Sequence, residues 1–158
     1  MNQSCELNMK KPKNTPFYER PAFEYAIAKS ESQNCLGSGE ALVQGCLCLR
    51  ISNIHNEVKT KTYLWVRYGN IMDFRKRLLE VHRTAPLDFL LKSTVKLMAV
   101  RKGQSCVWCE ESMEQGSIEV ALVNANDSIA MKKVLFLHDA CKDDLADALL
   151  FWLMPPSN

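Results

Sequence analysis

Two pairs of side chains in the last third of the chain have the types and spacing of metal ligands. Cys106 and Cys109 form a Cys-x2-Cys pair, and after 28 intervening residues His138 and Cys141 form a His-x2-Cys pair. Thiolate and imidazole ligands in two short pairs match a tetrahedral structural zinc site, because each pair spans two neighbouring corners of the tetrahedron. The sequence therefore predicts one structural Zn²⁺ ion per chain, held by these four side chains.

Two other interpretations of the four residues are open. Cysteine is often a small buried apolar residue, and the pairs could instead form disulfides in an oxidising compartment. Two correctly ordered pairs favour zinc over both. Four protein ligands leave the ion no open coordination position, and the chain shows no glycine-rich nucleotide loop, serine nucleophile elbow or helical His-Glu-x-x-His. We therefore expect a protein that is not an enzyme, with a metal-dependent hydrolase as the last alternative.

The residues around the two pairs are expected to form a hairpin and a helix. Residues 118–123 and 133–137 are rich in aliphatic residues and are separated by turn formers, which predicts two strands. The second strand leads into His138. A helical spacing of apolar residues follows from Asp139 until two prolines end it. A ligand-bearing turn, a hairpin and a helix that carries the last ligand in its first turn follow one another in a treble-clef zinc finger.

The spacing Cys-x2-Cys-x28-His-x2-Cys resembles that of the zinc fingers of poly(ADP-ribose) polymerases and of related DNA ligases. Arg101-Lys102 before the first pair and the step Gly116-x-Ile118 after it are also similar to that family. The resemblance covers about the last third of the chain and implies zinc binding by the four matched ligand positions. Where those fingers tend to have a basic residue after the glycine, this chain has Ser117 and Glu119, so the partner of the finger stays open.

The preceding region, residues 16–100, is expected to contain both strands and helices. A short helix is predicted within residues 17–32, with Pro21 in its first turn. Residues 41–52 and 60–68 are rich in β-branched and aromatic residues and are expected to pair as an antiparallel hairpin.

Two helical segments are expected after this hairpin. Asn70 is a candidate N-cap for a helix that has Ile71, Phe74 and Leu78 on one apolar face. Residues 87–100 are expected to form a second helical segment that turns to strand near Val95. No internal repeat is recognised in the sequence.

These elements together predict an α+β fold. A basic N-terminal β-hairpin with helices in residues 16–100 would pack on a C-terminal treble-clef-like zinc finger in residues 101–158. Residues 1–15 are polar and are expected to form a flexible tail rather than a signal peptide. The longest apolar run is too short to span a bilayer. We therefore expect a cytoplasmic protein, or a nuclear one if the source is a eukaryote, with no membrane partner.

The remaining cysteines leave a second metal site open. Cys46 and Cys48 alternate along a predicted strand, and Cys35 precedes them. These thiols could bind a metal with Cys5, His55 or His82, but their irregular spacing favours buried thiols. The count of seven cysteines is odd, which speaks against a secreted disulfide framework.

Charge divides the chain unevenly. Residues 1–105 contain 17 Lys and Arg against 9 Asp and Glu, whereas residues 106–158 contain 3 against 9. Phosphate contacts come mainly from lysine and arginine, so an acidic finger is a poor clamp for nucleic acid. The alternative is that the cations form only a solvated helix face. The candidate nucleic-acid-binding residues are Arg67, Arg75, Lys76, Arg77, Arg83, Arg101 and Lys102.

Two classes of function follow. The first is a non-catalytic zinc-binding protein that binds DNA or RNA, or serves as a small subunit of a nucleoprotein complex. The second is a protein-interaction adaptor, or an inhibitor of a nucleic-acid enzyme, whose oppositely charged halves each bind a partner. The polarised charge serves either class, so the sequence does not choose between a nucleic-acid and a protein partner.

Overall fold

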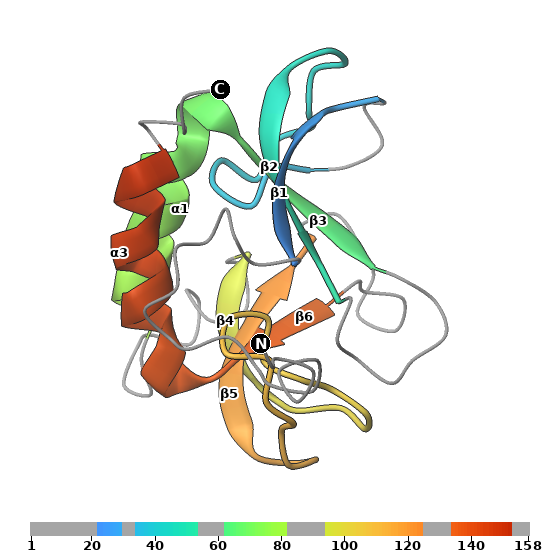
Figure 1. Cartoon of the computed structure of the whole chain (residues 1–158), viewed down its shortest axis with the longest axis vertical. Helices are drawn as coiled ribbons and strands as arrows, with labels where there is room; N and C mark the ends of the chain where they lie inside the picture. Colours follow the sequence, from blue (N-terminus) through green and yellow to red (C-terminus); the bar gives the residue numbers. More distant parts are fainter. Residues whose placement is uncertain (1–21, 30–33, 54–61, 82–93, 125–133, 153–158) are drawn as a thin grey trace, which may run out of the picture.

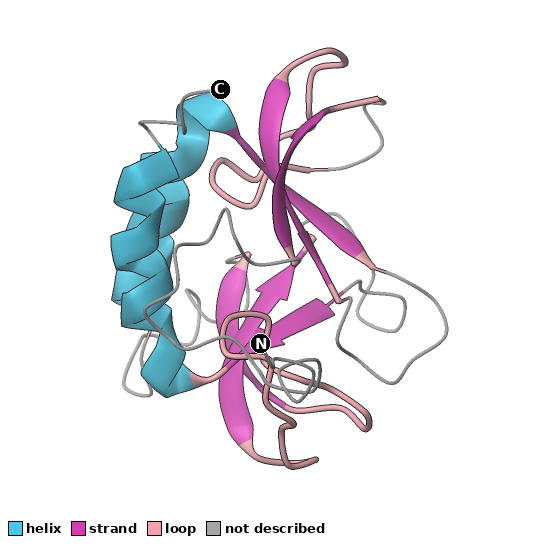
Figure 2. Ribbon diagram, in the orientation of Figure 1, coloured by secondary structure: helices cyan, strands magenta, loops and turns pink. Residues whose placement is uncertain are grey.

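The computed structural model describes residues 22–29, 34–53, 62–81, 94–124 and 134–152. Within these ranges the chain forms two three-stranded antiparallel sheets and two α-helices (Figure 2). Figure 1 shows the helices side by side along one flank of the molecule, with the two sheets next to each other beside them. The α+β class expected from the sequence is confirmed.

The first sheet contains β1 (Phe23–Ile27), β2 (Leu47–Ser52) and β3 (Tyr63–Arg67) in that order. The expected antiparallel pairing of the second and third of these strands is present, with Ser52 opposite Tyr63. The helix expected within residues 17–32 is wrong where the structure describes it, because residues 23–27 form β1. Phe23 pairs with Ile51 of β2 and is buried. Pairing with β2 therefore outweighs the weak helical signal of this segment.

The second sheet contains β4 (Val95–Ala99), β5 (Ile118–Val123) and β6 (Val134–Leu137). The expected turn to strand near Val95 is confirmed, while most of the helical segment that was expected to precede it falls on residues 82–93, outside the described ranges. The hairpin of β5 and β6 agrees with the two strands expected around residues 118–137. Every residue of β6 is buried, because the strand packs within the core.

Each sheet leads into a helix through one turn of 3₁₀-helix. β3 runs into η3 (Tyr68–Asn70) and α1 (Ile71–Glu80), and β6 runs, after His138, into η4 (Asp139–Cys141) and α3 (Lys142–Trp152). The expected helix after Asn70 is confirmed. The Asn70 side chain does not bond a backbone amide there, and instead donates from Nδ2 to the Asp73 carboxylate at 2.8 Å.

The same order of elements therefore occurs twice: three strands, a 3₁₀ turn and an α-helix. The structure thus contains an internal repeat that is not recognised in the sequence. Few side chains are identical between the two halves, so the repetition shows mainly in the backbone. We call residues 22–81 the N-terminal unit and residues 94–152 the C-terminal unit.

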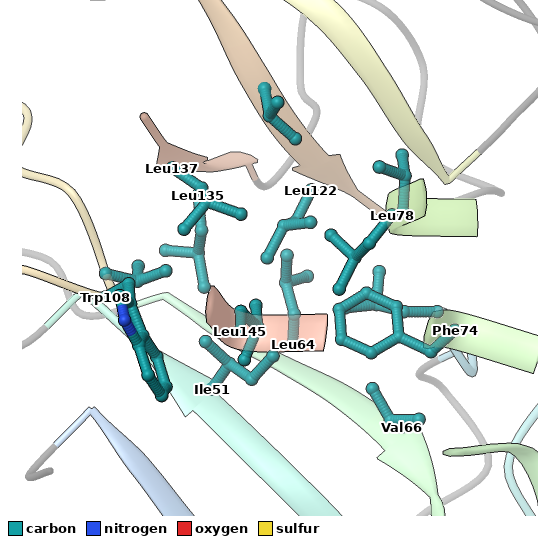
Figure 3. Close-up of a cluster of buried hydrophobic side chains, with 14 of the residues drawn as sticks. Ile51, Leu64, Val66, Phe74, Leu78, Trp108, Leu122, Leu135, Leu137 and Leu145 are labelled. Atoms are coloured by element: carbon teal, nitrogen blue, oxygen red, sulfur yellow. The ribbon is translucent and has the colours of Figure 1, made fainter. Parts of the chain in front are cut away.

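The two units share one continuous hydrophobic core. Figure 3 shows side chains from both sheets and both helices pointing toward one another, among them Val66 and Phe74 of the N-terminal unit and Leu122 and Leu145 of the C-terminal unit. Trp108 also crosses the boundary, because its ring meets Phe23 edge-on with centroids 5.6 Å apart. Burial of this shared apolar surface ties the folding of each unit to the other.

Candidate metal centre

A tight turn between β4 and β5 positions the first pair of ligands. The Ser105–Ser112 bridge closes the turn, and the Cys106 amide donates to the Glu111 carbonyl at 2.9 Å. The Glu110 amide donates back to the Cys106 carbonyl at 2.9 Å, which requires Glu110 to adopt a left-handed φ of 71°. This conformation is uncommon for a residue other than glycine, so the turn that holds the two cysteines is tightly determined.

The second pair lies where β6 passes into the helix. His138 follows the last residue of β6, and Cys141 ends the 3₁₀ turn η4, with its amide donating to the His138 carbonyl at 2.8 Å. The Val107 amide donates to the Phe136 carbonyl at 3.0 Å, which brings the ligand turn against β6. The two pairs meet because this bond joins the segments that carry them.

The four ligand atoms form one compact cluster. Those of Cys106, Cys109, His138 and Cys141 all lie within 4.8 Å of one another. The three cysteines are buried and His138 is half-buried. The Nδ1 atom of His138 lies 3.3 Å from the Cys109 sulfur and 4.0 Å from the Cys141 sulfur. This arrangement could hold one metal ion, with His138 presenting Nδ1 to it.

Backbone amides surround the Cys106 sulfur. It accepts N–H groups from Trp108 at 3.4 Å, Cys109 at 3.5 Å and His138 at 3.4 Å. Three donors aimed at one sulfur favour its thiolate form, because a hydrogen bond to the charged form stabilises that form. These amides therefore favour an anionic sulfur, which is the form of cysteine that binds a metal.

The same geometry spreads the pKa values of the ligands apart. Burial acts to raise the pKa of the Cys106 thiol, but hydrogen bonds from Cys109, Cys141 and His138 together hold it far below its usual range. Hydrogen bonding to Cys106 in turn raises the pKa of Cys109, of Cys141 and of His138. Metal ligands must lose their protons to bind, so a cation bound here would lower the raised pKa values of Cys109, Cys141 and His138.

Glu119 supports the second pair from β5. Its Oε1 accepts the Asp139 amide at 2.8 Å, and its charge contributes to the raised pKa of His138. In the sequence, Glu119 stands out only as a departure from a basic pattern. Its position opposite the start of η4 depends on the strand register, so no local sequence signal could have assigned this supporting role.

The candidate nucleic-acid-binding residues occupy several elements. Arg67 is exposed at the end of β3, and Lys76 is exposed on α1. Arg75 and Arg77 are half-buried, because Arg75 donates from Nε to the Ala146 carbonyl at 3.0 Å and Arg77 donates to Thr94 Oγ1 at 2.8 Å.

Arg75 and Arg77 thus join the two units. Of the other described candidates, only Lys76 lies with them on α1. Arg101 and Lys102 are exposed in the turn after β4, and Arg83 lies outside the described residues.

The remaining thiols do not form a second cluster of three or more metal ligands within the described ranges. The sulfurs of Cys46 and Cys48 lie 3.5 Å apart. Burial, together with the Cys46 side chain, raises the pKa of Cys48 to about 12. Cys5, His55 and His82, which were considered as further ligands, fall outside the described residues.

Comparison with known proteins identifies no family: no protein-family model and no curated protein matches the chain. In the part of the chain that the structure describes, no helix combines the length and apolar character needed to cross a membrane.

Proposed function

We propose that the cluster of Cys106, Cys109, His138 and Cys141 is a structural zinc site in a treble-clef finger, and that the protein is a non-catalytic nucleic-acid-binding protein or a small subunit of a nucleoprotein complex. The observation that carries the proposal is the compact set of four mutually close protein ligands, three of them buried thiols.

The donor set and its spacing support zinc. Zn–S bonds of about 2.3 Å and Zn–N bonds of about 2.0–2.1 Å place neighbouring tetrahedral ligands about 3.5–3.8 Å apart. The two His138–sulfur distances of 3.3 and 4.0 Å lie within a few tenths of an ångström of that range. The order of ligand turn, hairpin and helix supports a treble clef and the resemblance to poly(ADP-ribose) polymerase fingers.

A binding role is favoured over a hydrolytic one. Catalytic zinc usually keeps one coordination position for water or substrate, whereas four protein ligands complete the tetrahedron. The zinc would then contribute folding free energy to the chain. Binding of a partner would depend on the surfaces that the metal stabilises.

The distribution of cations suggests that the N-terminal unit contacts nucleic acid. Helix α1 carries three consecutive cations, whereas α3 has one lysine and three aspartates. Arg67 and Lys76 are exposed and so positioned to meet phosphate. Arg75 and Arg77 bridge the units, so their substitution would confuse a binding defect with a loss of packing.

Fluorescence anisotropy with single- and double-stranded probes tests this proposal. Arg67→Gln with Lys76→Gln should weaken binding and, for duplex DNA, reduce the slope of log affinity against log salt by about 1.8 if each cation contacts one phosphate. Lys29→Gln with Lys142→Gln makes the same charge change outside the candidate set and should leave the slope unchanged. If the unmodified protein shows no salt-sensitive binding to either probe, the nucleic-acid proposal is refuted.

A second candidate function, the protein-interaction adaptor, has its own observation. Ile27 and Leu47 pair at one end of the first sheet and are 52% and 38% exposed, and Val43 in the preceding turn is 53% exposed. Exposed apolar groups of this kind often mark protein contacts. A defined partner that survives nuclease treatment, yet is lost with Ile27→Ser and Leu47→Ser, would support the adaptor.

A further inference from the structure

The two units repeat the same hydrogen bonds at a constant distance along the chain. The Leu36 amide donates to the Trp65 carbonyl at 2.8 Å, and 71 residues later Val107 donates to Phe136 at 3.0 Å. The bond from Gly39 to Cys35, at 2.8 Å, likewise recurs 71 residues later as that from Glu110 to Cys106, at 2.9 Å. The Asn34–Ala41 bridge recurs as Ser105–Ser112.

Unusual backbone conformations recur at the same distance. Gly39 has a φ of 79°, and its equivalent Glu110 has a φ of 71°. Gly45 has a φ of 92°, and its equivalent Gly116 has a φ of 91°. Glycine adopts a positive φ readily, but other residues seldom do, so the match of Glu110 to Gly39 indicates that the two turns share one geometry. The two units therefore share the local geometry of the ligand turn as well as the order of their elements.

This equivalence assigns four residues of the N-terminal unit to the positions of the candidate metal ligands. The four ligands of the C-terminal unit correspond, in order, to Cys35, Ser38, Arg67 and Asn70. Cys35 has kept the surroundings of a ligand, because its sulfur accepts the Gly37 and Arg67 amides, each at 3.3 Å. These donors are the equivalents of Trp108 and His138, which donate to the Cys106 sulfur.

Direct contacts join the residues at the ligand-equivalent positions of the N-terminal unit. The Cys35 thiol donates to Asn70 Oδ1 across 3.8 Å, joining the residues at the first and last ligand positions. The turn also packs closely on η3, since a Cβ at Gly37 would lie 2.4 Å from the Asn70 carbonyl oxygen. A hydrogen bond from the sulfur and a close backbone contact thus hold the turn against η3 in the N-terminal unit.

We propose that the chain is an internal duplication of one metal-binding unit in which the roles have divided: the C-terminal copy keeps the metal, and the N-terminal copy has exchanged its metal for a phosphate-binding role, with Arg67 at a former ligand position. The assignment of the vacated site rests on the geometry alone. The phosphate contact rests on the proposed function.

The divergence of charge between equivalent positions supports this division. Arg75, Lys76 and Arg77 of α1 correspond to Ala146, Asp147 and Ala148 of α3. Arg75 also donates to the carbonyl of its own equivalent, Ala146. Equivalent residues meet in this way near a two-fold axis, so the two units are related by an approximate two-fold through the packed helices.

Restoring the lost ligands tests the vacated site. In the full chain, Ser38→Cys, Arg67→His and Asn70→Cys should raise the zinc content, measured by elemental analysis after dialysis, from one to two equivalents. Cobalt substitution should double the visible absorption typical of tetrahedral thiolate sites. Adding Cys35→Ser removes the fourth ligand of the second site, which is native, and should lower the affinity of that site at least tenfold.

A second variant tests the site without the histidine substitution, in case Arg67→His prevents folding. Ser38→Cys with Asn70→Cys keeps Arg67 and offers three thiolates, so it should take up a second, more weakly held cobalt ion. A single equivalent of metal in both folded variants would overturn the assignment. Failure of both variants to fold would also count against it, because ligand side chains should fit ligand positions.

The phosphate role has a separate readout. Arg67→Gln should weaken binding of a duplex probe several-fold and reduce the salt slope by about 0.9, while the zinc content stays at one equivalent. Unchanged binding would reject Arg67 as a phosphate contact and leave the vacated site standing. If the unmodified protein binds no nucleic acid, the proposed function and the phosphate role fail together, and the restored-ligand experiment still decides the duplication.

Discussion

Cys106→Ser and Cys35→Ser remove the same atom from equivalent positions of the two units, with very different expected costs. Both sulfurs are buried and accept backbone amides. Only Cys106 lies in the cluster of four ligands. The chain thus provides its own matched control for the contribution of the metal.

The expected loss of stability in each variant depends on the interactions that its sulfur makes. Structural zinc contributes about 10–16 kcal/mol of apparent binding free energy in small zinc-dependent folds, and a typical domain is stable by only about 5–15 kcal/mol. Cys106→Ser should therefore leave the chain largely unfolded at 37 °C. Cys35→Ser weakens hydrogen bonds that contribute about 0.5–1.5 kcal/mol each, so the protein should lose about 1–2 kcal/mol and stay folded.

Circular dichroism during thermal and urea unfolding, with zinc measured on the same samples, makes the comparison. For a chain of this size, 1 kcal/mol corresponds to a Tm change of about 2–4 °C, so Cys35→Ser should lower Tm by about 2–8 °C with zinc unchanged. Equal losses of stability in the two variants would refute the reasoning. A Cys106→Ser protein that keeps its zinc and its Tm would refute it equally.

Three further outcomes are expected. The hydrogen bond with Cys106 raises the pKa of His138, and the ring must lose its proton to bind a metal, so log zinc affinity in a chelator competition should fall by at least about one per pH unit below that pKa; a flat profile would exclude His138 as a ligand. The edge-on contact of Phe23 and Trp108 should give a coupling of about 0.5–1.5 kcal/mol in a double-mutant cycle of urea unfolding, whereas additive effects would show that this contact does not couple the units. Cys48 is fully buried with a pKa of about 12, so iodoacetamide should label the half-buried Cys46 first in the native protein, and equal labelling by mass spectrometry would contradict this.

Local signals predicted the C-terminal unit well. The strand expected over residues 118–123 coincides with β5, and the next expected strand differs from β6 by one residue. Runs of aliphatic residues bounded by turn formers give such elements strong signals. The four candidate metal ligands were also identifiable, because their types and spacing are properties of the sequence itself.

Features that depend on residues far apart in the sequence could not be predicted from local patterns. The apolar spacing of Phe23, Ala26 and Ile27 fits a helix, and only pairing with β2 makes the segment a strand. The cations on α1 were visible as charge, but the bonds of Arg75 and Arg77 to the other unit were not. The repeat is not visible in the sequence because it lies mainly in the backbone geometry. Glu110, for example, is equivalent to a glycine, Gly39.

A protein that depends on a metal can rarely lose one ligand at a time, because each intermediate would be unfolded and removed by selection. The shared core changes that constraint: Thr94 bonds the Leu36 carbonyl, and Trp108 packs on Phe23. On the duplication proposed above, a folded sibling would have supported the N-terminal copy while its ligand positions drifted. The descendant would need half the zinc of its ancestor, and this saving would favour its retention wherever the metal is scarce.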